Sequence, residues 1–150
     1  MTTTAAAAWS RLNGLIREEA MIRLQITGET PGKKNSKIWT RSGKLIPSAK
    51  HQKWHADALN QLQKYLDLVM CGIEHPGPIE PIDYPVSVTL TFYHGDQVRR
   101  DSDNQAASIM DLLQDAKILA DDRWQIVRIL NIYNHFDKGN ARCLIEINEL

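Results

Sequence analysis

Two segments of this 150-residue chain alternate apolar and polar residues strictly enough to predict β-strands with one buried face. The first runs from Met21 to Thr27 and the second from Val86 to Tyr93. The side chains predicted to point inward are Ile22, Leu24, Ile26, Val86, Val88, Leu90 and Phe92. A strand that buries only one face needs a second layer, so the chain must also supply helices that cover it.

Two segments with helical periodicity can form that layer. Ser48 is the predicted N-cap of a helix that continues to about Met70, and Asp103 that of a helix to about Lys117. The segment from Gly28 to Pro47 has no periodicity and is predicted to be a loop with a short hairpin about Ser42-Gly43. Four prolines make the segment from Cys71 to Pro85 a connector.

The last part of the chain is predicted to form two further strands, Gln125 to Tyr133 and Ala141 to Ile147. We expect the intervening segment, Asn134 to Asn140, to be a hairpin turn. The resulting order β-α-β-α-β-β indicates an α+β fold with a small mixed β-sheet and two main helices. The length fits one domain, which we assign to residues 21–150, after an N-terminal extension at residues 1–20.

Composition is that of an ordinary soluble protein, with 43% apolar and 24% charged residues. Cys71 and Cys143 belong to no Cys/His cluster, which favours reduced thiols and a cytoplasmic location. No apolar run is long enough to cross a membrane. Motifs for an organic cofactor, such as a Gly-rich phosphate-binding loop, are absent from the sequence.

The zero net charge conceals two segments of opposite sign. Between Gly28 and Lys53 there are seven cations and one acid, Glu29, whereas seven acids lie between Asp96 and Asp122. The basic segment is either a surface for phosphates, where Trp39 can stack on a base, or simply a solvated loop.

Asp101 and Asp103 are separated by one residue, so in extended backbone their carboxylates point to the same side. Asp121-Asp122 provides a second acidic pair just before a predicted strand. If that strand lies beside the one that ends near Tyr93, we expect Asp122 to approach Asp101 and Asp103. Such carboxylates are the hard oxygen ligands that Mg²⁺ or Mn²⁺ prefers. The alternative is that the acids only cap a helix. A zinc site at His51 and His55 is a weaker hypothesis, because Gln52 replaces the catalytic Glu of such motifs.

The chain resembles the RusA-type Holliday junction resolvases, small endonucleases of phage and prophage origin, from about Met21 onward. The resemblance rests on the run Arg99-Arg100-Asp101-Ser102-Asp103-Asn104, the following helix, Asp121-Asp122 and Gln125-Ile126. It implies that Asp101, Asp103 and Asp122 hold a catalytic Mg²⁺. It also implies a homodimer that cuts four-way DNA junctions symmetrically during recombination and repair. The DNA-binding residues would be Lys33, Lys34, Lys37, Arg99 and Arg100.

Two positions depart from the family pattern. The family has a functionally important Lys four residues after the second Asp, where this chain has Ala107, and Trp124 adds a residue before Gln125. Lys117 lies roughly 15 Å further along the helix and is a poor substitute. Ala107 keeps open a second hypothesis, a junction- or DNA-binding protein with weak or lost catalysis. A third is a structural or protein-interaction domain.

Overall fold

The structure is a computed structural model that describes residues 22–34, 37–70 and 80–150. The predicted extension at residues 1–20 and most of the predicted connector, residues 71–79, lie outside the described residues. None of the helices in the described ranges is both long and apolar enough to cross a membrane.

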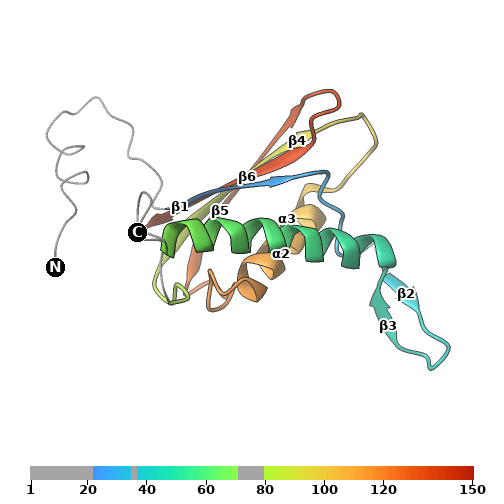
Figure 1. The fold of residues 1–150 in the computed structure, drawn as a ribbon, viewed down its shortest axis with the longest axis horizontal. Helices are drawn as coiled ribbons and strands as arrows, with labels where there is room; N and C mark the ends of the chain where they lie inside the picture. The colour runs from blue at the N-terminus through green and yellow to red at the C-terminus, as the bar shows by residue number, and fades with distance from the viewer. Residues whose placement is uncertain (1–21, 35–36, 71–79) are drawn as a thin grey trace, which may run out of the picture.

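A four-stranded mixed sheet forms one layer of the molecule, as the sequence predicts (Figure 1). Its strands in spatial order are β1 (Ile22–Thr27), β6 (Arg142–Glu149), β4 (Val86–His94) and β5 (Val127–Phe136). Strand β6 is antiparallel to both of its neighbours, whereas β4 and β5 are parallel. The parallel pair requires the crossover that the helix between β4 and β5 provides.

The predicted hairpin between the last two strands is wrong, because β5 and β6 are not neighbours in the sheet. Strand β6 buries Cys143, Ile145 and Ile147 completely and lies between β1 and β4, whereas most of β5 is exposed and forms an edge. The connecting segment passes over the end of β4, where the Asp137 amide donates to the His94 carbonyl at 2.9 Å. Burial therefore decides the strand order over closeness in sequence.

Two helices cover one face of the sheet: α2 (Ala49–Met70) and α3 (Ser102–Asp115). Ser48 caps α2 as predicted, since its hydroxyl accepts from the His51 amide at 3.2 Å. The predicted cap of α3 is two residues off. Asp101 is the N-cap residue and Asp103 lies in the first turn.

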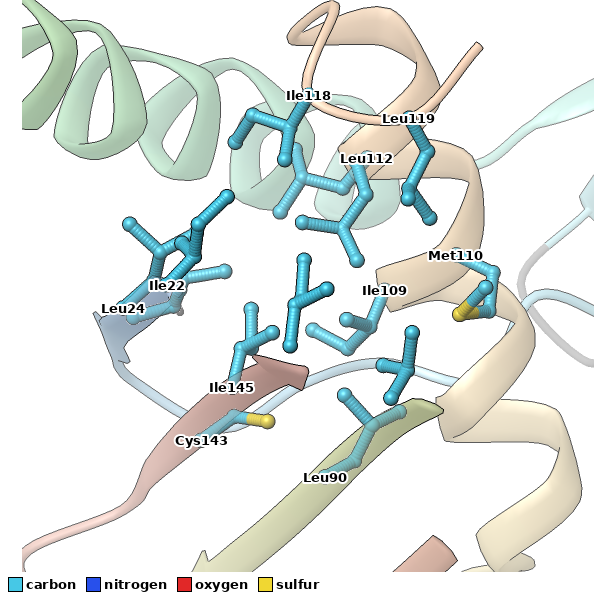
Figure 2. Close-up of a cluster of buried hydrophobic side chains, with 14 of the residues drawn as sticks. Ile22, Leu24, Leu90, Ile109, Met110, Leu112, Ile118, Leu119, Cys143 and Ile145 are labelled. Carbon is cyan, nitrogen blue, oxygen red and sulfur yellow. The ribbon is translucent and has the colours of Figure 1, made fainter. Parts of the chain in front are cut away.

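The core lies between this helix layer and the sheet (Figure 2). All seven inward-pointing strand residues predicted from the alternation are at most 4% exposed. Figure 2 shows Leu24, Leu90 and Ile145 from three strands pointing toward Ile109 and Leu112 of α3. The sheet therefore fixes the position of α3, whose first turn carries the acidic motif.

A small hairpin projects away from this body (Figure 1). It consists of β2 (Lys37–Trp39) paired with β3 (Leu45–Pro47), and the predicted turn at Ser42-Gly43 is confirmed, with Gly43 at a φ of 78°. The Trp39 side chain is 73% exposed. The hairpin therefore presents an aromatic ring and several cations to solvent.

Candidate metal and nucleic-acid site

Asp101 and Asp103 lie together at the start of α3, beyond the carboxyl end of β4. The Asn134 side-chain amide donates to the Ser102 hydroxyl at 2.9 Å, which ties the start of α3 to the same end of β5. The Asp101 backbone has φ −98° and ψ 119°, and its side chain makes no hydrogen bond to the first turn of the helix. Asp101 is thus an N-cap residue without a side-chain capping hydrogen bond, and Asp103, the predicted cap, lies in the first turn instead.

Asp122 lies at the opposite end of the molecule from this pair. It follows α3, whose 14 residues span about 20 Å, and it precedes the amino end of β5. Because β4 and β5 are parallel, the residues after β4 and those before β5 are at opposite ends of the sheet. Among the residues that the structure describes, no three His, Cys, Asp or Glu side chains form a group that could hold a metal. The expectation that Asp122 approaches Asp101 and Asp103 within one chain is therefore wrong.

The segment Glu29–Lys34, which we call the lysine loop, packs on the first half of α3. Buried polar side chains of the helix hold its backbone: the Asn104 Oδ1 accepts from the Lys34 amide at 2.6 Å, and the Ser108 hydroxyl donates to the Pro31 carbonyl at 2.6 Å. A Cβ atom on Gly32 would lie 2.5 Å from the Asn104 Nδ2. The contact between loop and helix is therefore close and fixed at the backbone.

Two lysines of this loop pair with acids of α3. The Lys33 Nζ lies 2.6 Å from the Asp111 Oδ2, and the Lys34 Nζ lies 3.5 Å from the Asp103 Oδ2. The basic and acidic segments of the sequence are thus neighbours in space. Exposed ion pairs of this kind are weak and exchange readily with other partners.

Glu29 is a residue of this site that the sequence analysis did not single out. Its Oε1 is 2.7 Å from the His94 Nδ1, 3.1 Å from the Gln105 Nε2 and 3.2 Å from the Arg100 Nε. The only available signal was its position as the single acid among seven cations. Glu29 joins the lysine loop, the end of β4 and the approach to α3.

The two arginines before the acidic pair have different environments. Arg99 is exposed, whereas the Arg100 side chain is 20% exposed and donates two hydrogen bonds to Asp96, at 2.6 and 3.1 Å. These hydrogen bonds lower the pKa of Asp96 to about 2. The Arg100 guanidinium is therefore already paired with protein groups. The exposed side chain of Arg99 is the one of the two that is accessible to a ligand.

Lys37 lies outside this cluster, on the projecting hairpin. It is exposed on β2 next to Trp39, and Arg41 and Lys44 are exposed in the turn between β2 and β3. These cations are separated from the acids of α3. They give the hairpin, which projects from the body of the molecule in Figure 1, three exposed cations.

The two histidines of α2 each contact α3. The His51 Nε2 is 3.3 Å from the Ser108 hydroxyl, and the His55 Nε2 is 2.8 Å from the Asp115 Oδ2. Burial lowers the pKa of His51, and the neighbouring His55 lowers it further. These two contacts connect α2 to α3, the helix on which the lysine loop packs.

Comparison with known proteins agrees with the motif order. No family model matches the chain. A curated relative, the crossover junction endodeoxyribonuclease RusA of Aquifex aeolicus (strain VF5), is 24% identical over 133 residues, which cover 89% of this chain and 95% of the relative. The chain is similar to RusA. The likeness extends over most of RusA and, at 133 of 150 residues, includes the lysine loop and α3.

Proposed function

We propose that this protein is a Mg²⁺-dependent endodeoxyribonuclease that resolves four-way DNA junctions in the cytoplasm during recombination or repair. The observation that carries the proposal is the pair Asp101 and Asp103 at the start of α3, beside the cations of the lysine loop. The similarity of the chain to a crossover junction endodeoxyribonuclease over most of its length supports junction DNA as the substrate class.

Asp101 and Asp103 fit a divalent cation chemically. Mg²⁺ is commonly held by one or two carboxylates together with water and substrate phosphate, and both carboxylates here are exposed. Bound Mg²⁺, or Mn²⁺ in its place, would neutralise charge on the phosphate and lower the pKa of an attacking water. The chain's own contribution is to hold two anionic ligands at a fixed helix start.

Phosphates of the DNA would lie on the lysine loop and the projecting hairpin. Lys33, Lys34 and Lys37 supply positive charge there, and Arg99 is the arginine that is exposed enough to contact the backbone. Trp39 is exposed and would stack on an unpaired base at the branch point. Arg100 supports these contacts by holding Glu29 and Asp96.

A homodimer would bring Asp122 to the acidic pair. Strand β5 is an edge strand whose two faces carry exposed apolar side chains, and such an edge favours pairing with another chain. The exposed apolar residues of β5 are Ile129, Leu130, Tyr133 and Phe136. Antiparallel pairing of two β5 strands across a two-fold axis places the amino end of one beside the carboxyl end of the other. The partner's Asp122 then lies at the end of the sheet where this chain holds Asp101 and Asp103.

Cleavage of a labelled four-way junction tests the function. We expect paired, symmetric nicks with Mg²⁺, and a loss of about 100-fold or more in Asp103→Asn. Asp57→Asn, which removes an exposed acid on α2, is the matched control and should cleave normally. The proposal is refuted if the wild type makes no nicks at any metal concentration, or if Asp103→Asn cleaves as well as the control.

Mixing two inactive variants tests the shared site. In a mixed dimer of Asp103→Asn and Asp122→Asn, a site built from two chains leaves one of the two sites intact. A site built within one chain leaves none. We expect single-strand nicking to reappear on mixing, and its absence would exclude the shared arrangement.

Ala107 favours a second candidate function, junction binding with little or no cleavage. In that case neutralising Asp101 or Asp103 should tighten DNA binding without any loss of nicking, because it only removes repulsion from phosphates. Salt-sensitive junction binding by a wild type that does not nick would identify this second function.

A further inference from the structure

We propose that Lys34 is a catalytic residue of this site, which contacts the phosphate next to Asp103 and supplies a positive charge that α3 itself lacks. The inference rests on the proposed nuclease function. It assigns to a residue of the lysine loop a role that the acidic helix cannot fill.

The backbone of Lys34 is held at the helix. Its amide donates to the Asn104 Oδ1 at 2.6 Å, and the adjacent Lys33 amide donates to the Asn104 carbonyl at 3.2 Å. Asn104 is 4% exposed, and Gly32 packs against its side chain without space for a Cβ atom. The Cα of Lys34 is therefore fixed relative to Asp103, while its four-carbon side chain keeps its freedom.

The turn of α3 after Asp103 offers no cation. Asp103, Ala107 and Asp111 follow one another at intervals of four residues and so lie along one face of the helix. The loop covers this face, with the ammonium of Lys34 at Asp103 and that of Lys33 at Asp111. The charge that a longer side chain at 107 would provide therefore comes from the loop.

The two lysines differ in how firmly they are held. The pair of Lys33 and Asp111 is short, at 2.6 Å, whereas the pair of Lys34 and Asp103 is longer, at 3.5 Å. The side chains of Lys34 and Asp103 are 73% and 74% exposed. Such a pair is readily exchanged. When the Asp103 carboxylate takes another cation, Lys34 can donate its hydrogen bonds to a non-bridging phosphate oxygen at the same place, without any covalent step.

Metal-free junction binding tests the link between Lys34 and Asp103 without relying on catalysis. In EDTA, Asp103→Asn releases Lys34 and should tighten binding about 3-fold. In a Lys34→Ala background the same substitution should tighten binding by less than about 1.5-fold, because no paired lysine is released and only the weak, solvent-screened repulsion between Asp103 and the phosphates is removed. Equal effects of Asp103→Asn in the two backgrounds would overturn the proposed pairing, whether or not the protein is a nuclease.

Single-turnover cleavage at saturating protein tests the catalytic role. We expect Lys34→Ala to lower the rate about 100-fold and Lys64→Ala, which removes an exposed lysine of α2, to leave it unchanged. Adding Ala107→Lys to Lys34→Ala should restore at least 10-fold of the loss, because it returns a cation to the same helix face. A Lys34→Ala variant that cleaves at the control rate would overturn the inference while the nuclease function stands. A wild type without cleavage would refute the function on which the inference rests.

Discussion

Gly32→Ala tests whether the close contact between the lysine loop and α3 positions the site. Gly32 does not have a positive φ, unlike Gly28, Gly43 and Gly139, so an alanine there is strained only by lack of space. Its Cβ would lie 2.5 Å from the Nδ2 and 2.9 Å from the Cγ of Asn104. The buried amide of Asn104 must therefore turn away, which breaks its hydrogen bond to the Lys34 amide.

Gly32→Ala should lower the stability in two ways, through overpacking and through the loss of a hydrogen bond. Overpacking costs about 1–3 kcal/mol, and the loss of a buried hydrogen bond about 1 kcal/mol, so the free energy of unfolding should fall by about 2–4 kcal/mol. In an Asn104→Ala background the amide is absent and the nearest remaining atom is the Cβ at 3.5 Å, an ordinary contact. There Gly32→Ala should cost less than about 0.5 kcal/mol.

Urea unfolding of the four proteins in this cycle, followed by circular dichroism, measures both effects at an unchanged m-value. The coupling between the two sites should be about 1.5–4 kcal/mol. Gly32→Ala should also slow junction cleavage, because it displaces Lys34. An equal cost of Gly32→Ala in both backgrounds would show that the loop does not pack on Asn104 as described.

Three further predictions concern the interface, the ion pairs and the core. Tyr133→Lys, at the exposed edge of β5, should shift the protein from dimer to monomer in sedimentation and abolish cleavage; a dimer that persists would argue against pairing through β5. The Asp96 carboxyl should titrate near pH 2 by NMR and return toward 3.8 in Arg100→Met, so the contribution of this pair to stability is complete above about pH 4 and is lost as the pH falls through 2. Burial raises the pKa of Cys143 to about 12, so in a Cys71→Ser variant it should resist iodoacetamide at pH 8 until the protein is unfolded by urea; rapid labelling of the folded protein would contradict this burial.

The helices and strands were predictable because an element with one buried face repeats its apolar residues at the period of that element. The alternation in β1 and β4 correctly marked the strands, and the helical periodicity after Asp103 correctly predicted α3, whose buried face includes Ala106, Ile109 and Leu113. Trp124, by contrast, carries no periodic signal that predicts its place. It lies 70% exposed in the turn before β5, where the Val127 amide donates to the Arg123 carbonyl at 3.0 Å. Trp124 is therefore accommodated in the turn before the strand begins.

The pairing of the elements was less predictable, and the error over Asp122 follows from it. The expectation for Asp122 depended on the strand after it lying beside β4, and the two strands do pair, but the sequence does not state whether they are parallel. A helix such as α3 between two adjacent strands favours the parallel arrangement, which moves Asp122 to the other end. Likewise, the polar residues Gln105 and Ser108 carried no signal of the loop that they hold.

The central place of β6 has a consequence for how the protein is made. In the sheet, β1 and β4 are connected through β6, residues 142–149, which are synthesised after both of them. Until β6 has been synthesised, the apolar faces of β1 and β4 are not joined in one sheet and the core is incomplete. We therefore expect the domain to fold only after residues 142–149 have been synthesised. A chain interrupted before Arg142 would retain every acid and lysine of the proposed site and still have no sheet to hold them in place.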